Sequence, residues 1–307
     1  MTAVDRGVQL PLRTLLDPLT PSVAKAEIYA EDTYVQETVE HLERLGIDAG
    51  AFAQEHSLLL LKPDAIAARA VQPTLEWLSQ NGFQVIGAHR LAVNRHLVRA
   101  IWYFAWNIAS AERRRVADLL VGISDALVLV VRGSAGELPV PVRLTEAKGP
   151  TDPRKRQPGQ LRYVLGRHNF LLNLVHSPDD PADVLREFSI FFDEQTRARM
   201  LTPVEDGAAV AAELAQDIYQ EAPERSFDRA DAVLRVRREL MDRGVPVAQE
   251  LSDADCARLL NEAWDAGHEL DPWSVLVLGS YVLPMRTGTG PQTLPPVTAQ
   301  TWLEGRA

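Results

Sequence analysis

The chain has 307 residues, of which 46% are hydrophobic and 24% charged, and its formal charge is −10. This length is typical of about two domains, and the composition excludes a chain without a packed core. The excess of acidic residues argues against binding to nucleic acid or to acidic membranes, and no apolar run approaches the ~18 residues of a membrane span. Because the chain has one cysteine, Cys256, and no secretory signal at its start, we expect a cytoplasmic protein.

The first 55 residues predict an extended arm followed by a helix. Residues 1–19 contain prolines and show little periodicity. From Thr20 the sequence Thr-Pro-Ser is typical of a helix start, and apolar residues then recur at helical spacing as far as Leu45. Gly46 is the expected stop.

Residues 56–201 alternate between strand and helix patterns. Strands are predicted at 57–62, 83–89, 125–131 and 170–176, and helices up to residue 80, at 95–108, at 111–121 and at 180–192. The continuous apolar run of the first strand predicts burial on both faces. This order favours an α+β fold of ferredoxin-like type, with one antiparallel sheet covered by helices.

The remaining residues, 202–307, predict a C-terminal helical region. Residues 233–241 are amphipathic, Ser252 is a capping residue for a second helix, and the apolar stretch 273–283 can close a small bundle. The tail after Pro284 is rich in Thr, Pro and Gly, so we expect it to be loosely ordered. The sheet domain over 56–201 is therefore expected to carry helical extensions on both sides.

A long irregular stretch from Gly133 to Arg162 is the first candidate for a binding site, because connections of that length in a compact domain are usually functional. Arginines in such a loop can hold phosphate oxygens bidentately, so an anion site is one interpretation and a solvated charged loop is the other. Its cationic and hydroxyl donors are Arg143, Lys148, Thr151, Arg154, Lys155, Arg156 and Arg162.

Two further side chains stand at the predicted ends of strands. Lys62 ends the first strand, where its ammonium group can meet a phosphate as a compact charge. His176 ends the fourth strand, and Glu187 lies on the helix that follows. A carboxylate bonded to one ring nitrogen would fix the tautomer of the histidine and leave the other nitrogen as a nucleophile. A structural or merely exposed histidine is the alternative.

Four motifs follow one another between His56 and Leu201. They are Lys62-Pro-Asp-Ala65, Arg143 … Thr151-Asp-Pro153 … Pro158-Gly159-Gln-Leu-Arg162, Asn173-Leu-Val-His176-Ser-Pro-Asp179 and Glu187-Phe-Ser-Ile-Phe-Phe192. In this order they resemble the motifs of the nucleoside diphosphate kinases, which read K-P-D-A, R … T-N-P … P-G-T-I-R and N-x-x-H-G-S-D, followed by a helix with a glutamate.

The resemblance implies a phosphotransferase. The γ-phosphate of a nucleoside triphosphate would pass to His176 as a phosphohistidine and then to a nucleoside diphosphate, with Glu187 orienting the ring. The resemblance also implies that Asp179 lies near a Mg²⁺ ion that bridges the phosphates of ATP or another triphosphate, and it is compatible with a homo-oligomer. The residues that would hold the ribose and phosphates are Lys62, Arg143, Thr151, Arg162 and Asn173.

Two departures from the family motifs keep other functions open. Ser177-Pro178 replaces the family's Gly-Ser after the histidine, and proline has no donor. No phenylalanine stands where the family stacks the base; Arg114 is the nearest residue, and it can stack on a base or contact an additional phosphate. The alternatives are the same chemistry on a specialised phosphorylated acceptor, or a non-catalytic module that binds a nucleotide or a partner.

Overall fold

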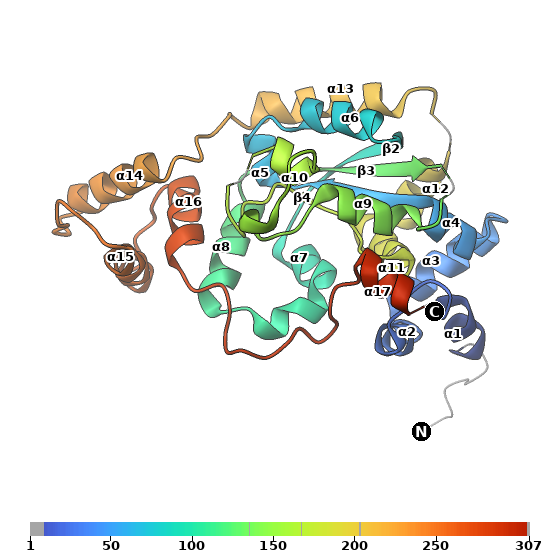
Figure 1. The fold of residues 1–307 in the computed structure, drawn as a ribbon. Helices are drawn as coiled ribbons and strands as arrows, with labels where there is room; N and C mark the ends of the chain where they lie inside the picture. Colours follow the sequence, from blue (N-terminus) through green and yellow to red (C-terminus); the bar gives the residue numbers. More distant parts are fainter. Residues whose placement is uncertain (1–8, 135, 167, 203, 306–307) are drawn as a thin grey trace.

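The centre of the protein is an antiparallel sheet of four strands in the order β2-β3-β1-β4 (Figure 1). A computed structural model describes residues 9–134, 136–166, 168–202 and 204–305, so the first eight residues of the expected arm lie outside the described residues. The strands are β1 (His56–Leu61), β2 (Phe83–Leu91), β3 (Ala126–Gly133) and β4 (Val175–His176). The α+β, ferredoxin-like architecture expected from the sequence is confirmed.

Strand β1 lies between β3 and β4 and is buried along its length, as its apolar run predicts. Since successive side chains of a strand point to opposite faces, Leu59 belongs to the core on one face of the sheet and Leu60 to the core on the other. Leu60 pairs with His176 of β4. This register sets His176 beside the end of β1, where Lys62 begins the next helix.

Three helices cover the face of the sheet that contains Leu59 (Figure 1). They are α5 (Pro63–Ala67), α6 (Val71–Gln80) and α13 (Gly207–Glu221). The first turn of α13 lies so close to β2 that a Cβ at Gly207 would collide with the backbone of Val85. Glycine therefore permits this docking, and a helix from beyond residue 201 is part of the main sheet layer.

The opposite face is covered mainly by α11 and by the N-terminal helices (Figure 1). Helices α3 and α4 pack on α11, and all of them share one apolar core with the sheet. The elements on this side are α1 (Gln9–Leu16), α2 (Val23–Tyr29), α3 (Thr33–Arg44), α4 (Ala49–Glu55), α11 (Pro181–Phe191) and α12 (Glu194–Leu201). The N-terminal segment is thus integrated into the fold.

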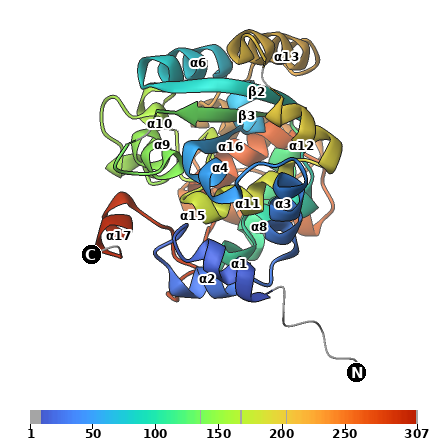
Figure 2. The same cartoon turned by 90° about the vertical axis from the view of Figure 1, so that its right-hand side faces the viewer.

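The C-terminal helices form a third core against α8 (Ala111–Val121). They are α14 (Arg229–Asp242), α15 (Asp253–Asp265) and α16 (Pro272–Val282). Residues 284–298, which we call the strap, then run back past α8 to α17 (Ala299–Glu304) (Figure 1). In Figure 2, α17 lies beside the N-terminal helices, and a Cβ on Gly305 would lie only 2.6 Å from Pro21.

Several predicted elements differ from the structure. The predicted strand 170–176 is regular only at β4, because the Asn169 side chain accepts hydrogen bonds from the backbone of Leu171 and Leu172 and forms a turn there. The predicted helix from Thr20 to Leu45 is divided at Asp32, which caps α3. The expected extended arm contains α1, and the expected loose tail contains the bonded strap and α17.

The stretch 133–162 is also more regular than predicted. It contains helix α9, whose apolar side chains Val140, Val142 and Leu144 are buried, and two shorter helical turns. Their bounds are α9 (Val140–Lys148), η2 (Pro153–Lys155) and α10 (Leu161–Val164). The predicted helix 95–108 forms α7 (Arg95–Ile101) and the 3-10 helix η1 (Tyr103–Ile108). None of the helices in the described part of the chain combines the length and apolar character that a membrane span requires.

Candidate functional site

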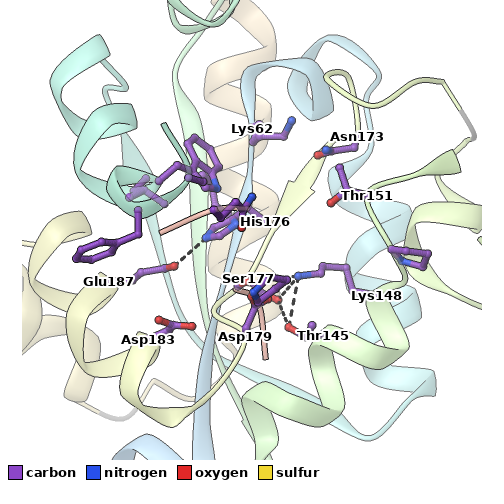
Figure 3. A pocket seen from close by; sticks show the side chains of 18 of the residues that line it. Lys62, Thr145, Lys148, Thr151, Asn173, His176, Ser177, Asp179, Asp183 and Glu187 are labelled. Carbon is purple, nitrogen blue, oxygen red and sulfur yellow. Dashed lines mark hydrogen bonds and ion pairs between the residues drawn. The ribbon is translucent and has the colours of Figure 1, made fainter. Parts of the chain in front are cut away.

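A cavity of about 620 Å³ opens beside the end of β1 and includes His176 in its wall (Figure 3). Its polar side is formed by the ends of β1 and β4, by α9 and by the stretch after α9. Its apolar side is formed by α7, η1 and α8. Seven of the nine residues that the sequence predicts for the site line this cavity: Lys62, Thr151, Arg162, Asn173, His176, Asp179 and Glu187.

His176 is oriented by Glu187 on α11. Nε2 of the ring lies 2.9 Å from Oε1 and 3.0 Å from Oε2 of the glutamate (Figure 3). With the hydrogen on Nε2 donated to the carboxylate, the lone pair remains on Nδ1, which has no hydrogen-bond partner among the described residues. Burial raises the pKa of Glu187, while the nearby imidazole opposes the shift. Trp102 meets the ring edge-on at 5.1 Å between centroids.

The approach to His176 is a strained turn. Leu174 has φ 67°, a left-handed conformation that is unfavourable for a side chain of this kind. Asp64 accepts a hydrogen bond from Leu174 N at 2.9 Å, and Lys62 N donates to Leu174 O at 2.9 Å. The Lys62-Pro-Asp-Ala motif therefore holds the strained turn in place, and such strain persists where the surrounding structure fixes it.

Buried cations line the polar side of the cavity. The ammonium of Lys62 donates to Leu171 O at 3.0 Å and lies 3.3 Å from Asp64. Arg162 donates to Gly149 O at 3.0 Å and to Val175 O. Burial lowers the pKa of Lys62, and it lowers the pKa of Arg162 to about 9. Burial thus outweighs the attraction of nearby carboxylates at both groups, and an anion in the cavity would stabilise their charged forms.

Three uncharged or acidic predicted residues complete this side. The hydroxyl of Thr151 accepts from Arg162 at 3.3 Å, and the amide of Asn173 donates to Phe170 O at 2.9 Å. Burial raises the pKa of Asp179, and Lys148 opposes the shift. All three side chains remain in the cavity wall.

Arg143 does not reach the site, contrary to prediction. Its guanidinium donates to Ser134 O and lies above the ring of Phe83. The reason is the unpredicted helix α9: Arg143 and Lys148 are five residues apart, or roughly 140° around the axis, whereas Thr145 and Lys148 are separated by roughly 60°. Thr145 and Lys148 line the cavity in its place. Lys148 is among the donors that the sequence predicts for the stretch 133–162, whereas Thr145 is not, and a helix over 140–148 would place both on the same side.

The prediction that Arg114 lies where a nucleotide base would stack also needs correction. Arg114 is exposed on α8 and donates to Ala109 O at 2.7 Å. Its neighbour Arg113 lines the cavity instead, with its guanidinium 5.6 Å from the ring of Trp106 and 5.7 Å from that of Phe170. Sequence reasoning missed the two aromatic residues because it searched only for a phenylalanine near Arg114.

Both extensions contribute to the cavity wall. From α2, Lys25 and Tyr29 bond to Asp183 at 2.8 and 2.6 Å. From the strap, residues 292 and 294–298 line the cavity. The strap is held to η1, where Thr293 N donates to Phe104 O at 3.0 Å. Beyond the strap, Ala299 N donates to Glu146 on α9 at 2.9 Å.

Known proteins resemble the sheet part of this chain. The nucleoside diphosphate kinase family model matches residues 55–197. A nucleoside diphosphate kinase of Roseiflexus castenholzii is 29% identical over 145 residues, which cover 45% of this chain and 87% of that relative. The solved structure of the Aquifex aeolicus nucleoside diphosphate kinase has a TM-score of 0.39 and 22% identity, and the likeness covers 45% of this chain and 95% of that one.

A nucleoside diphosphate kinase of Chloroflexus aurantiacus is 32% identical over 139 residues, covering 45% of this chain and 87% of the relative. The match thus spans most of that relative, and more than half of this chain lies outside it. The chain belongs to the nucleoside diphosphate kinase family.

Proposed function

We propose that the protein carries the γ-phosphate of a nucleoside triphosphate on His176 and passes it to a nucleoside diphosphate. The observation that supports this most directly is the contact of Nε2 with Glu187, which leaves Nδ1 as the nucleophile in a cavity lined with buried cations. Residues 56–201 would form the catalytic unit, and the segments 1–55 and 202–307 would complete its pocket.

In the first step, the lone pair of Nδ1 attacks the γ-phosphorus and forms an N–P bond. The bond from that phosphorus to the β–γ bridging oxygen breaks, and its electron pair leaves with the nucleoside diphosphate. The imidazole becomes positively charged as it bonds to phosphorus, and the Glu187 carboxylate stabilises that charge through Nε2–H. In the second step, a terminal oxygen of an acceptor diphosphate attacks the same phosphorus, and the N–P bond returns its pair to Nδ1.

The cations of the cavity would hold the donor's phosphates in line with Nδ1. Phosphoryl transfer depends chiefly on such positioning and on neutralising charge at the phosphate oxygens. Lys62 and Arg162 would supply positive charge, and Thr151 and Asn173 would supply uncharged hydrogen bonds to the phosphates and ribose.

The same wall fits a magnesium ion that arrives with the nucleotide. Among the described residues no group of three or more His, Cys, Asp or Glu side chains could hold a metal by itself. Mg²⁺ usually needs only one or two protein carboxylates beside substrate phosphates, and Asp179 is a carboxylate in the cavity wall three residues after His176. When bound, the ion would neutralise charge on the phosphate oxygens.

A second candidate is the same chemistry with a specialised phosphorylated acceptor. It is favoured by the altered base side, where Arg113 stands between two aromatic rings, and by the strap in the cavity wall. A cation there would favour a ligand with an electron-rich ring or an additional anionic group.

Labelling with γ-³²P-ATP and Mg²⁺ tests the proposal. The wild type should yield a phosphoprotein that is labile to acid and stable to base, whereas His176→Ala should yield none. Equal labelling of both proteins would refute the phosphohistidine. Adding GDP, UDP, CDP or ADP to the isolated phosphoprotein then separates the two candidates, since similar discharge by all four would remove the case for a specialised acceptor.

A further inference from the structure

Lys148, the last residue of α9, is a buried lysine that contacts no carboxylate among the described residues. Its side chain is 4% exposed and lines the cavity. Its ammonium donates to Ser177 Oγ at 2.7 Å, with longer contacts of 3.4 Å to Ser177 O and to Thr145 Oγ1. All three partners are uncharged oxygens. In Figure 3 the side chain extends from α9 toward Ser177, the residue that follows His176.

Lys25 shows what a buried lysine in this protein looks like when its charge is balanced. It is 3% exposed, and its ammonium lies 3.0 Å from Asp180 and 2.8 Å from Asp183. Burial alone would lower its pKa, yet these carboxylates raise it above the ordinary value. Lys148 is as deeply buried and has no such ion pair within the described part of the chain.

The pKa of Lys148 is shifted in the opposite direction from that of Lys25. Burial lowers its pKa to about 7, and the positive charge of Arg162 acts in the same direction. Asp179, Glu187 and Glu146 attract the ammonium from a distance without compensating for its burial. Because a buried charge without a counterion is costly, the site is suited to an anion that enters the cavity.

We propose that Lys148 binds the phosphoryl group in transit, donating to its oxygens both on the triphosphate and on His176. This inference rests on the proposed function. It also explains how the site has cationic charge from α9 although Arg143 faces the other way, since Lys148 occupies the side of the helix that faces the cavity. The two 3.4 Å contacts would be exchanged for stronger ones to phosphate oxygens.

A purely structural role would be to brace Ser177. Ser177 Oγ also contacts Thr145 Oγ1 at 3.0 Å, and Thr145 contacts Pro178 O at 2.9 Å, so the turn after His176 has a second attachment to α9. If bracing were the whole role, removing the Ser177 hydroxyl would cause the same loss as removing the Lys148 ammonium. The two roles are therefore separable by mutation.

The experiment compares Lys148→Met, Lys148→Arg and Ser177→Ala with Lys155→Met, a lysine that is exposed and outside the cavity wall. Quench-flow with γ-³²P-ATP and Mg²⁺ measures the rate of labelling, and titration calorimetry measures the affinity for Mg·ATP. We expect Lys148→Met to label about 10²-fold more slowly, a loss typical of one hydrogen-bond donor to a transition state. We expect Lys148→Arg to recover most of the rate, Ser177→Ala to lose less than Lys148→Met, and Lys155→Met to match the wild type.

Wild-type labelling and affinity in Lys148→Met would overturn the proposal, and so would equal losses in Lys148→Met and Ser177→Ala. If the wild type takes no label, the proposed function fails, but calorimetry still tests whether Lys148 binds phosphate. Weaker Mg·ATP binding by Lys148→Met than by Lys155→Met would support that role, and equal binding would refute it. Circular dichroism monitors folding, and if Lys148→Met does not fold, Lys148→Gln replaces it in the same comparison.

Discussion

One ring nitrogen of His176 faces both carboxylate oxygens of Glu187, at 2.9 and 3.0 Å. This shared hydrogen bond fixes the plane of the ring and the position of its proton together. Because Glu187 is buried on α11, the ring cannot turn away without leaving a buried carboxylate unpaired. The ring orientation that the proposed phosphotransfer requires is therefore set by Glu187.

Glu187→Gln should keep the shape of this contact and remove its charge. We expect labelling from ATP to slow by about 10²-fold, since the positive imidazole formed on phosphorylation loses its counterion, while Mg·ATP affinity stays near that of the wild type. Rapid-quench labelling and calorimetry measure the two quantities. An unchanged labelling rate would show that Glu187 does not orient the phosphate carrier.

Arg143→Ala and Arg162→Ala form a matched pair from the same motif. Arg143 lies outside the cavity, so its loss should leave Mg·ATP affinity within about twofold of the wild type. Arg162 joins Gly149 O to Val175 O, and its loss should weaken binding and reduce the free energy of unfolding by about 2–4 kcal/mol. Urea unfolding measures the stability of both variants, and calorimetry measures their affinity for Mg·ATP. A loss of affinity greater than twofold in Arg143→Ala would show that Arg143 does contribute to the site.

Arg113→Ala and Arg114→Ala test the base side in the same way. Arg113 lies by the rings of Trp106 and Phe170, so its loss should change the relative affinities for GDP and CDP by about 10-fold, or about 1.4 kcal/mol. Arg114 is exposed and outside the cavity wall, so its loss should leave the affinities for GDP and CDP unchanged. Competition binding with a fluorescent nucleotide makes the comparison; equal preferences in the two variants would contradict a role in base recognition.

The low pKa of Lys148, about 7, predicts a dependence on pH. With ATP well below saturation, labelling should fall as pH rises through and above about 7, because the amine loses the proton that attracts phosphate. Arg162 favours this loss, whereas Asp179, Glu187 and Glu146 oppose it. Lys148→Arg stays charged over this range, so the decline at higher pH should disappear. A decline of equal size in both proteins would assign it to another group.

Trp302 on α17 anchors the end of the strap and is 1% exposed, whereas its neighbour Leu303 is 47% exposed. Trp302→Ala should destabilise the fold by about 3–5 kcal/mol if the strap unfolds with the rest, as large core deletions do. A smaller loss with faster nucleotide release in stopped-flow traces would mean that the strap opens by itself. Leu303→Ala is the control and should change neither stability nor release.

The meeting of Lys62, His176 and Glu187 in one cavity was predictable because these residues stand at fixed places in a regular pattern. Lys62 and His176 end strands, and Glu187 lies on the next helix, so knowing the strands was enough to bring them together. The error at Arg143 came from treating 133–162 as a loop. In an irregular loop any side chain can face a ligand, whereas in a helix the spacing along the sequence fixes which side chains share one face.

Contacts of the N- and C-terminal extensions with the cavity could not be predicted. Nothing in the proline-rich sequence around Leu294 indicates that it lies in the same cavity as Lys25. The position of the strap depends on which surfaces the apolar faces of α8, α16 and α17 pack against. Many packing arrangements are compatible with the same pattern of apolar residues. The strained turn at Leu174 likewise arises from Asp64, a partner distant in sequence.

The strap also affects the stage of protein synthesis at which the cavity can form. Residues 292–298 are synthesised long after His176, and chains emerge at about 5–20 residues per second. A nascent chain whose sheet has already folded therefore spends seconds with His176 beside a cavity wall that lacks these residues. Residues 292–298 complete that wall, so the cavity has its full lining only after they have been synthesised.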